Sequence, residues 1–294
     1  MKQVFAFFRL IRIGNLLMMV ATQILAYYFL THHLIAVDLL NKKFISVLIA
    51  TFLAGASGYI INDYLDIKID YINKPHRVIV GTEISRRVAM FLHLTFNVLA
   101  FALGLYINIY VAISIVICSA LLWLYSVVYK KSYLTGNLLI SSLSAYVILL
   151  LLLFDHSMSF YLVWVYALFA FISTLIREIL KDMEDMKGDA KYNSRTLPIV
   201  IGIRPTKNFL IYISVFFVVA ILLHLFLGNS FIPYNHHYTA ILYIGYMVLF
   251  VILPMTVFTY MLTLADTKRH YANLSLMMKL IMLTGMLSMA LLKL

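Results

Sequence analysis

The sequence predicts an all-α protein that crosses a membrane nine times. Hydrophobic residues make up 64% of the 294 residues, charged residues only 12%, and the mean hydropathy is +0.96. Soluble domains carry roughly 25% charged residues, so this chain has too few to cover a surface that faces water. The composition excludes soluble enzymes, disordered proteins and nucleic-acid-binding modules. We expect the net charge of +11 to reflect membrane topology and anionic substrates instead.

Nine stretches are apolar and long enough to span a bilayer, which takes about 20 residues per helix. Polar segments separate them, and only Asn108 divides the third stretch from the fourth. The connections are too short for a soluble domain, so residues 1–294 are expected to form a single transmembrane domain. The predicted spans cover residues 13–31, 44–65, 86–107, 109–129, 137–154, 158–181, 208–228, 238–262 and 272–292.

The basic residues predict the orientation of the chain. If the N-terminus lies in the cytoplasm, 19 Lys and Arg residues fall in the segments on the cytoplasmic side. Lys42, Lys43 and Lys293 fall on the opposite side, and Lys279 lies inside the last span. Because cytoplasmic loops are enriched in Lys and Arg, this distribution predicts a multi-pass protein of the cell (cytoplasmic) membrane with its N-terminus inside.

Two short acidic segments follow the second and sixth spans, and both have the spacing D-x-x-D-x-x-x-D. The aspartates are Asp63, Asp66 and Asp70 in the first segment and Asp182, Asp185 and Asp189 in the second. Corresponding residues are 119 positions apart, an offset that four helices with their loops account for. The spacing indicates a weak internal repeat, in which spans 2 and 3 match spans 6 and 7.

This spacing favours a metal site. With 100° per residue, positions i, i+3 and i+7 line one narrow face if the helix continues through the segment, and Glu178 joins the face of Asp182. Like-charged carboxylates at a membrane helix end are costly unless paired, so a multivalent cation is their natural partner. The donors are oxygen only, and the one cysteine, Cys118, lies in an apolar run. Such a set favours Mg²⁺, which commonly shares its coordination shell with substrate phosphates. The six aspartates therefore predict a metal clamp for a diphosphate.

Other functions fit these carboxylates less well. They could simply be solvated helix ends, but two copies at identical spacing on one side of the membrane argue against that interpretation. A transporter or cation channel would place its acids near the bilayer midplane, often beside broken helices. A CDP-alcohol phosphotransferase would carry the signature D-G-x-x-A-R, which this sequence lacks.

Basic residues flank both acidic segments and could bind a diphosphate as point charges or as guanidinium forks. The cytoplasmic bias of Lys and Arg would by itself also place cations here. The flanking residues are Lys68, Lys74, His76 and Arg77 after the first segment, Lys187, Lys191 and Arg195 after the second, and Lys130 and Lys131 in the loop between.

At these motifs the sequence resembles the UbiA superfamily of intramembrane prenyltransferases, and the resemblance covers essentially the whole chain. Residues 62–77 read N-D-Y-L-D-I-K-I-D-Y-I-N-K-P-H-R and fit the family pattern N-D-x-x-D-x-x-x-D-x-x-N-x-P-x-R. Residues 177–189, R-E-I-L-K-D-M-E-D-M-K-G-D, with R-T-L-P-I at 195–199, look most like the digeranylgeranylglyceryl phosphate synthase branch. Homogentisate and chlorophyll-type prenyltransferases carry a related K-D-x-x-D-x-x-G-D. Weaker similarities are Arg12-x-x-Asn15 and the segment from Tyr125 to Asn137.

The sequence departs from the family pattern at two places. Residues 78–82, V-I-V-G-T, follow Arg77 where the family usually has P-I-x-S-G, and Ile13 stands where Pro is common. Both departures are expected to affect loop shape and acceptor choice, and neither removes a metal ligand.

The resemblance implies nine helices around a central cavity, with both Asp-rich motifs at the cytoplasmic side. Mg²⁺ is the implied cofactor, and Tyr125 would stabilise an allylic cation through its π face. The implied catalytic aspartates are Asp63, Asp66, Asp182 and Asp185, and Asp70 and Asp189 complete the metal ligands. The implied substrate-binding residues are Asn15, Asn62, Lys68, Arg77, Lys130, Lys181 and Arg195.

The implied reaction is Mg²⁺-dependent transfer of an isoprenyl group from a prenyl diphosphate to a lipid-like acceptor. The second motif favours geranylgeranyl diphosphate as donor and geranylgeranylglyceryl phosphate as acceptor. The alternative is an aromatic acceptor, as in quinone or tocopherol-type biosynthesis. The expected partners are these substrates and membrane lipids.

Overall fold

A computed structural model describes residues 2–31, 39–73, 75–227 and 237–292. Over these ranges the regular structure is helical, and the extended pairings are two isolated β-bridges. The predicted all-α fold is confirmed. The α-helices are α1 (Lys2–Leu10), α2 (Ile13–Phe29), α3 (Lys42–Asn73), α4 (Arg86–Ile107), α5 (Ile109–Val127), α6 (Thr135–Phe154), α7 (Phe160–Lys191), α8 (Leu197–Ile201), α9 (Ile203–Leu227), α10 (His237–Met247), α11 (Leu253–Leu264) and α12 (Lys268–Leu287).

Eight helical segments of the described chain are long and apolar enough to cross a membrane, and the bent pair α1–α2 raises the number to nine. Two of the eight combine more than one element: a π-helical turn, Val248–Ile252, joins α10 to α11, and α12 continues as a 3₁₀ segment, Ser288–Leu292. Pro254 is the second residue of α11, two positions after the end of the π-helical turn. Since proline lacks a backbone N–H and crowds the preceding turn, a locally widened helix is the expected response.

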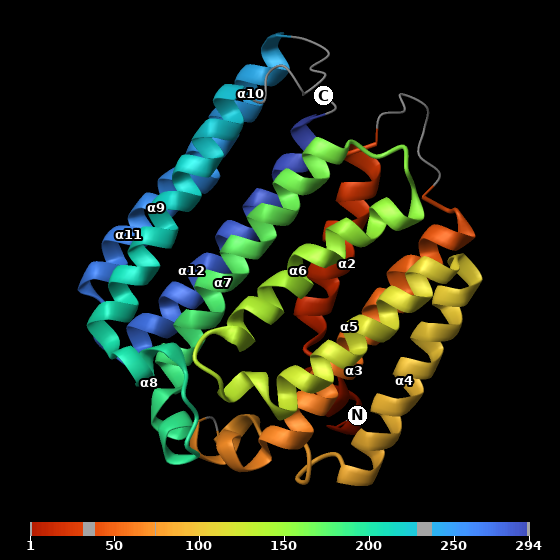
Figure 1. The fold of residues 1–294 in the computed structure, drawn as a ribbon, viewed down its shortest axis with the longest axis vertical. Helices are drawn as coiled ribbons and strands as arrows, with labels where there is room; N and C mark the ends of the chain where they lie inside the picture. The colour runs from red at the N-terminus through yellow and green to blue at the C-terminus, as the bar shows by residue number, and fades with distance from the viewer. Residues whose placement is uncertain (1, 32–38, 74, 228–236, 293–294) are drawn as a thin grey trace.

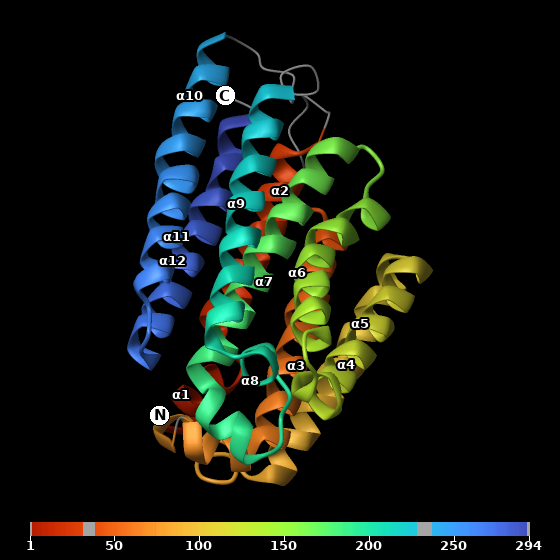
Figure 2. The ribbon, with the colours of Figure 1, turned by 60° about the vertical axis from the view of Figure 1, so that its left-hand side comes forward.

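The helices form an elongated bundle with α9, α10 and α11 at one side and α4 and α5 at the other (Figures 1 and 2). The largest buried cluster lies between the inner helices and includes Ile176 of α7, Phe217 of α9 and Met278 of α12. Large apolar side chains such as Phe226 and Tyr212 on α9 are 81% and 73% exposed. Such an apolar exterior is what a lipid-facing surface requires.

The third and fourth predicted spans divide at Asn108, as expected. Its side chain accepts a hydrogen bond of 2.9 Å from the backbone N–H of Val111, which caps the start of α5. Asn is among the preferred residues at this position because its carbonyl satisfies a backbone donor that the helix leaves unpaired.

Helices α3 and α7 are each 32 residues long, well beyond the predicted spans 44–65 and 158–181. At 1.5 Å per residue each is about 48 Å long, more than the roughly 30 Å of a hydrocarbon core. Their final turns therefore extend past the apolar region at the lower end of the bundle in Figure 1. Asp66, Asp70 and the second acidic segment lie in these extensions, and Asp63 lies in the last turn of the predicted span 44–65. Both helices continue through their acidic segments, so the aspartates of each segment line one face of the helix.

The chain bends by 53° between α1 and α2. Arg12, at the bend, has φ of 50° and ψ of 54°, the left-handed conformation that non-glycine residues rarely adopt. Strained backbone of this kind persists where surrounding structure holds it, often at functional sites. At this bend the Arg12 side chain extends to Asp63 on α3.

Candidate active site

Helices α3 and α7 meet at the ends that carry the acidic segments. The backbone N–H of Gly188 on α7 donates a 2.9 Å hydrogen bond to Oδ1 of Asn73, the last residue of α3. A Cβ at position 188 would lie 2.3 Å from that same oxygen, so only glycine allows this approach. The contact brings two segments more than a hundred residues apart in sequence to one end of the bundle.

The first acidic segment is neutralised by cations from other elements. Arg12, at the α1–α2 bend, donates to Oδ1 of Asp63 at 2.8 Å. Lys130, in the 3₁₀ turn Tyr129–Lys131 between α5 and α6, forms an ion pair with Asp66, which is only 3% exposed. Asp66 is thus a buried carboxylate paired with a cation from a different part of the chain.

Burial and neighbouring charges shift the pKa values of Lys130 and Asp70. Burial alone would lower the pKa of Lys130, but the Asp66 carboxylate beside it raises the pKa above its ordinary value, so the amine stays charged. Burial raises the pKa of Asp70 to about 6, the charges of Asp66 and Asp63 add to the effect, and Lys130 opposes it. The carboxylates of this segment crowd one another, which is the condition that a bound cation relieves.

The second acidic segment has different neighbours. Oδ2 of Asp182 accepts a 2.8 Å hydrogen bond from Nδ2 of Asn137, near the start of α6. Glu178, one turn earlier on the same face, pairs with Arg177 at 3.3 Å and with Lys181 at 2.5 Å. Asp185 is half-buried and Asp189 is buried.

The two segments share electrostatic neighbours. The charge of Lys130 acts on Asp182 as well as on Asp66 and Asp70. The hydroxyl of Tyr125, near the end of α5, interacts electrostatically with Glu178, Asp182 and Asp66. Lys130 and Tyr125 are therefore near enough to both acidic segments to interact with their charges.

The remaining predicted substrate-binding residues differ in their exposure. Asn62 is half-buried on α3, whereas the side chains of Lys68 and Arg195 are exposed. The backbone N–H of Arg195 donates to the carbonyl of Lys131 at 2.8 Å, which ties the segment after α7 to the loop that holds Lys130. The side chain of Arg77 lies outside the described part of the structure.

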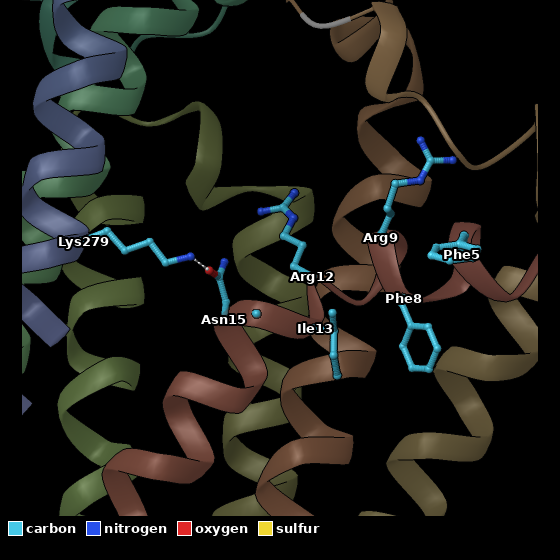
Figure 3. A pocket seen from close by; sticks show the side chains of 8 residues that line it. Phe5, Phe8, Arg9, Arg12, Ile13, Asn15 and Lys279 are labelled. Atoms are coloured by element: carbon cyan, nitrogen blue, oxygen red, sulfur yellow. Dashed lines mark hydrogen bonds between the residues drawn. The ribbon is translucent and has the colours of Figure 1, made fainter.

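A cavity of about 600 Å³ adjoins the first acidic segment at the bend between α1 and α2. Figure 3 shows Lys279 extending from α12 to Asn15 at the start of α2, where Nζ donates to Oδ1 at 2.8 Å. The Arg12 guanidinium lies 4.9 Å from the ring centroid of Tyr59, an arrangement typical of a cation–π contact. The lining residues are Phe5, Phe8, Arg9, Arg12, Ile13, Gly14, Asn15 and Lys279.

Four residues contact the site or its cavity without having been predicted as site residues: Arg12, Asn137, Glu178 and Lys279. The sequence did contain signals for them. Arg12 and Asn137 lie in the two weaker family similarities, and Glu178 falls on the face of Asp182. Lys279 is a lysine inside an apolar span, where an ionisable residue commonly marks a functional site.

The site supplies oxygen donors of the kind that Mg²⁺ binds. In the described residues no three His, Cys, Asp or Glu side chains stand close enough to enclose a metal. Arg12, Lys130 and Asn137 contact the aspartates. The donor chemistry, the helical register and the mutual repulsion of the carboxylates all fit a divalent ion. Such an ion would bind in competition with these cations.

Comparison with known proteins identifies the family. The sequence profile of the UbiA prenyltransferase family matches residues 14–283. The chain belongs to the UbiA prenyltransferase family. It is therefore a multi-pass membrane enzyme that transfers prenyl groups, in agreement with the sequence-based prediction.

Several relatives are digeranylgeranylglyceryl phosphate synthases. The enzyme of Sulfurisphaera tokodaii is 31% identical over 258 residues, which cover 86% of each chain. That of Saccharolobus solfataricus is 32% identical over 212 residues, 70% of this chain and 67% of the relative. That of Methanothermobacter thermautotrophicus is 38% identical over 164 residues, 54% of this chain and 57% of the relative.

Solved structures agree on the fold. A structure of digeranylgeranylglyceryl phosphate synthase is 28% identical, covers 98% of both chains and has a TM-score of 0.70. A UbiA homologue from Archaeoglobus fulgidus, bound to GPP and Mg²⁺, is 15% identical and covers 97% of this chain and 99% of its own, with a TM-score of 0.64. The predicted helical membrane architecture is confirmed by both similarities.

Proposed function

We propose that this UbiA-family prenyltransferase transfers the geranylgeranyl group of geranylgeranyl diphosphate to geranylgeranylglyceryl phosphate, with Mg²⁺ as cofactor. The observation that carries the proposal is the approach of two Asp-rich helix ends to one place, through the contact of Gly188 with Asn73, together with the pairing of Lys130 and Asp66. The relatives named as digeranylgeranylglyceryl phosphate synthases support this choice of acceptor. The whole of residues 1–294 would form one transmembrane domain.

The metal would be held by the carboxylates of both acidic segments. When bound, Mg²⁺ would supply positive charge that neutralises the diphosphate and stabilises the departing pyrophosphate. The homologue bound to GPP and Mg²⁺ supports this pairing of metal with prenyl diphosphate. The proposed ligands are Asp63, Asp66, Asp70, Asp182, Asp185 and Asp189.

The chain's own cations would bind the donor. Lys130 and Lys181 would hold the diphosphate oxygens as point charges, with Asn62 and Arg77 orienting the leaving group. Each of the two lysines is now paired with a carboxylate, Lys130 with Asp66 and Lys181 with Glu178. When metal charge balances those carboxylates, the ammonium groups become available to the diphosphate.

In the proposed reaction an acceptor hydroxyl oxygen forms a bond to C1 of the prenyl chain. The bond between C1 and the diphosphate oxygen breaks, its electron pair leaves on pyrophosphate, and the hydroxyl proton is released. Tyr125, which interacts with charges of both segments, would face the positive charge that develops at C1. The apolar interior of the bundle would hold the prenyl chain away from water.

The membrane orientation is part of the proposal. The distribution of Lys and Arg places the acidic end of the bundle at the cytoplasmic face of the cell membrane, where soluble prenyl diphosphates have access to it. Lys68 and Arg195, both exposed at this end, would contribute to the positive field around the site and attract the anionic donor.

Turnover by the purified protein in nanodiscs tests this function. The donor is labelled geranylgeranyl diphosphate with Mg²⁺, and parallel reactions contain geranylgeranylglyceryl phosphate, homogentisate, 4-hydroxybenzoate or 1,4-dihydroxy-2-naphthoate. We expect product only with the glyceryl phosphate, loss of product with EDTA and recovery when Mg²⁺ is returned. Transfer only to an aromatic acceptor would move the function to quinone or tocopherol-type biosynthesis, and metal-independent transfer would contradict the mechanism.

A further inference from the structure

The cavity at the α1–α2 bend combines a basic wall with an apolar wall. Arg9, Arg12 and Lys279 bring three cationic side chains to it, while Phe5 and Phe8 are 69% and 43% exposed and border it with hydrocarbon. In Figure 3 Asn15 lies between the ammonium of Lys279 and the side chain of Arg12, and the ring of Phe8 points away from them. A ligand that suits this lining has an anionic head and a long apolar body.

The three cations differ in how their charge is balanced. Arg9 forms an ion pair with Glu83, and Arg12 forms one with Asp63. Lys279 has no carboxylate partner among the described residues, and its contact there is the neutral Oδ1 of Asn15.

An unbalanced cation inside a membrane-spanning helix is costly and is kept where it faces a partner or a polar cavity. Lys279 lies 11 residues into α12, about 16 Å along the helix, and faces this cavity. The partner that Lys279 lacks among the described residues is an anion. A phosphomonoester carries about −1.5 to −2 charge near pH 7, more than a single carboxylate, and therefore matches a site with several cations.

The cavity is connected to the proposed reaction centre through one side chain. Arg12 lines the cavity and also donates to Asp63 of the first acidic segment. An anion bound beside Lys279 would thus be separated from the proposed metal site by the side chain of Arg12. This position suits a second substrate whose hydroxyl must reach C1 of the donor while its charged group stays clear of the diphosphate.

We infer that this cavity binds the phosphomonoester head of a lipid acceptor, with Lys279 as the main anion-binding residue and Asn15 holding its ammonium in place. The inference rests on the proposed function and assigns the residue that makes the enzyme prefer a phosphorylated acceptor. Asn15, predicted from the sequence as a substrate-binding residue, would act on the acceptor rather than on the donor diphosphate.

The test compares two acceptors that differ only in the phosphate, geranylgeranylglyceryl phosphate and geranylgeranylglycerol, at saturating donor. Lys279→Met, which keeps the length of the side chain, should raise KM for the phosphorylated acceptor by about tenfold to a hundredfold. KM for the alcohol and for geranylgeranyl diphosphate should stay within about threefold of wild type. Lys279→Arg should recover most of the preference because it retains the charge.

Arg269→Met is the matched control. Arg269 is an exposed cation in the first turn of the same helix, and its loss should leave both acceptor KM values unchanged. The inference would be overturned if Lys279→Met raised KM equally for both acceptors, or if it raised KM for the donor.

Binding measured without donor separates this inference from the proposed function. Geranylgeranylglyceryl phosphate and inorganic phosphate are titrated into the protein in phosphatidylcholine nanodiscs. We expect saturable binding of the lipid that Lys279→Met weakens, and far weaker binding of inorganic phosphate. If wild type transfers to the glyceryl phosphate but Lys279→Met changes neither binding nor KM, the function stands and the inference fails. If inorganic phosphate binds as tightly as the lipid, the cavity is a general anion site and the inference fails as well.

Discussion

The first acidic segment is balanced by cations that other parts of the chain supply, whereas the second is held by an amide and by charges on its own helix. Arg12 and Lys130 reach Asp63 and Asp66 from the α1–α2 bend and the loop before α6. Asp182 instead accepts from Asn137, and the cations Arg177 and Lys181 of α7 pair with Glu178.

This difference shows that identical spacing does not imply identical roles. A carboxylate already in an ion pair gives up that partner, or shares it, when a divalent ion binds. A carboxylate that only accepts a hydrogen bond loses less stabilisation when the divalent ion binds. We therefore expect the first segment to depend on its neighbouring cations more than the second depends on Asn137, and the following substitutions test that order.

Lys130→Met should have the largest effect of these variants. It leaves the buried Asp66 without its cation, which typically costs about 3–5 kcal/mol when one partner of a buried pair is removed. Turnover should fall by about a hundredfold or more, because the same cation is proposed to hold the diphosphate. Tm measured in EDTA should fall, and Mg²⁺ should restore part of it.

Lys131→Met is the control for that variant, because Lys131 is the next residue in the chain and its side chain is exposed. It should behave as wild type in both assays. Equal effects of the two substitutions would mean that the loop, and not the Lys130–Asp66 pair, accounts for the change.

Asn137→Ala should have a smaller effect, with turnover reduced by about tenfold. It removes the 2.8 Å hydrogen bond to Asp182, and an intramolecular hydrogen bond contributes about 0.5–1.5 kcal/mol. A steady-state comparison with Lys130→Met at saturating Mg²⁺ checks the order. A loss greater than that of Lys130→Met would reverse the proposed dependence of the two segments.

Gly188→Ala tests the contact that joins the two segments. The added Cβ would lie 2.3 Å from Oδ1 of Asn73, and overpacking of this kind costs about 1–3 kcal/mol. We expect a lower Tm and a raised KM for Mg²⁺. Gly245→Ala on α10, where a Cβ would meet nothing within 4 Å, should leave both quantities near the wild-type values.

Lys68→Ala and Arg195→Ala should have the smallest effects, below about threefold in turnover, because exposed charges act weakly through solvent. Their contribution should appear in the KM for the donor and decrease as salt is raised. A loss of turnover comparable to that of Lys130→Met would show that either side chain enters the site when substrate binds.

The sequence predicted the membrane architecture well because hydropathy reports directly which segments can lie in lipid. It ended two spans at residues 65 and 181, where the apolar signal stops, while the helices α3 and α7 continue to Asn73 and Lys191. It began the first span at residue 13, where α2 begins, but predicted no helix for α1, and no spacing rule indicates the left-handed conformation of Arg12 at the bend.

The aspartates were recognisable because their spacing follows the helical period. The spacing did not reveal the residues around them, since Arg12, Asn137 and Lys279 reach the site or its cavity only through tertiary packing. Lys130 is an intermediate case. Its position in a basic loop suggested a role, but its burial beside Asp66 required the structure.

The central claim is that the two acidic segments form one metal-dependent site, and a double-mutant comparison tests it most directly. Asp63→Asn, Asp182→Asn and the double variant are purified in nanodiscs, their folding is checked by circular dichroism, and geranylgeranyl transfer is measured with Mg²⁺. Because residues that act as a unit are strongly non-additive, each single variant should lose at least about 1,000-fold, and the double variant should lose no more. Turnover near wild type in either single variant, or losses that multiply in the double variant, would contradict a shared site.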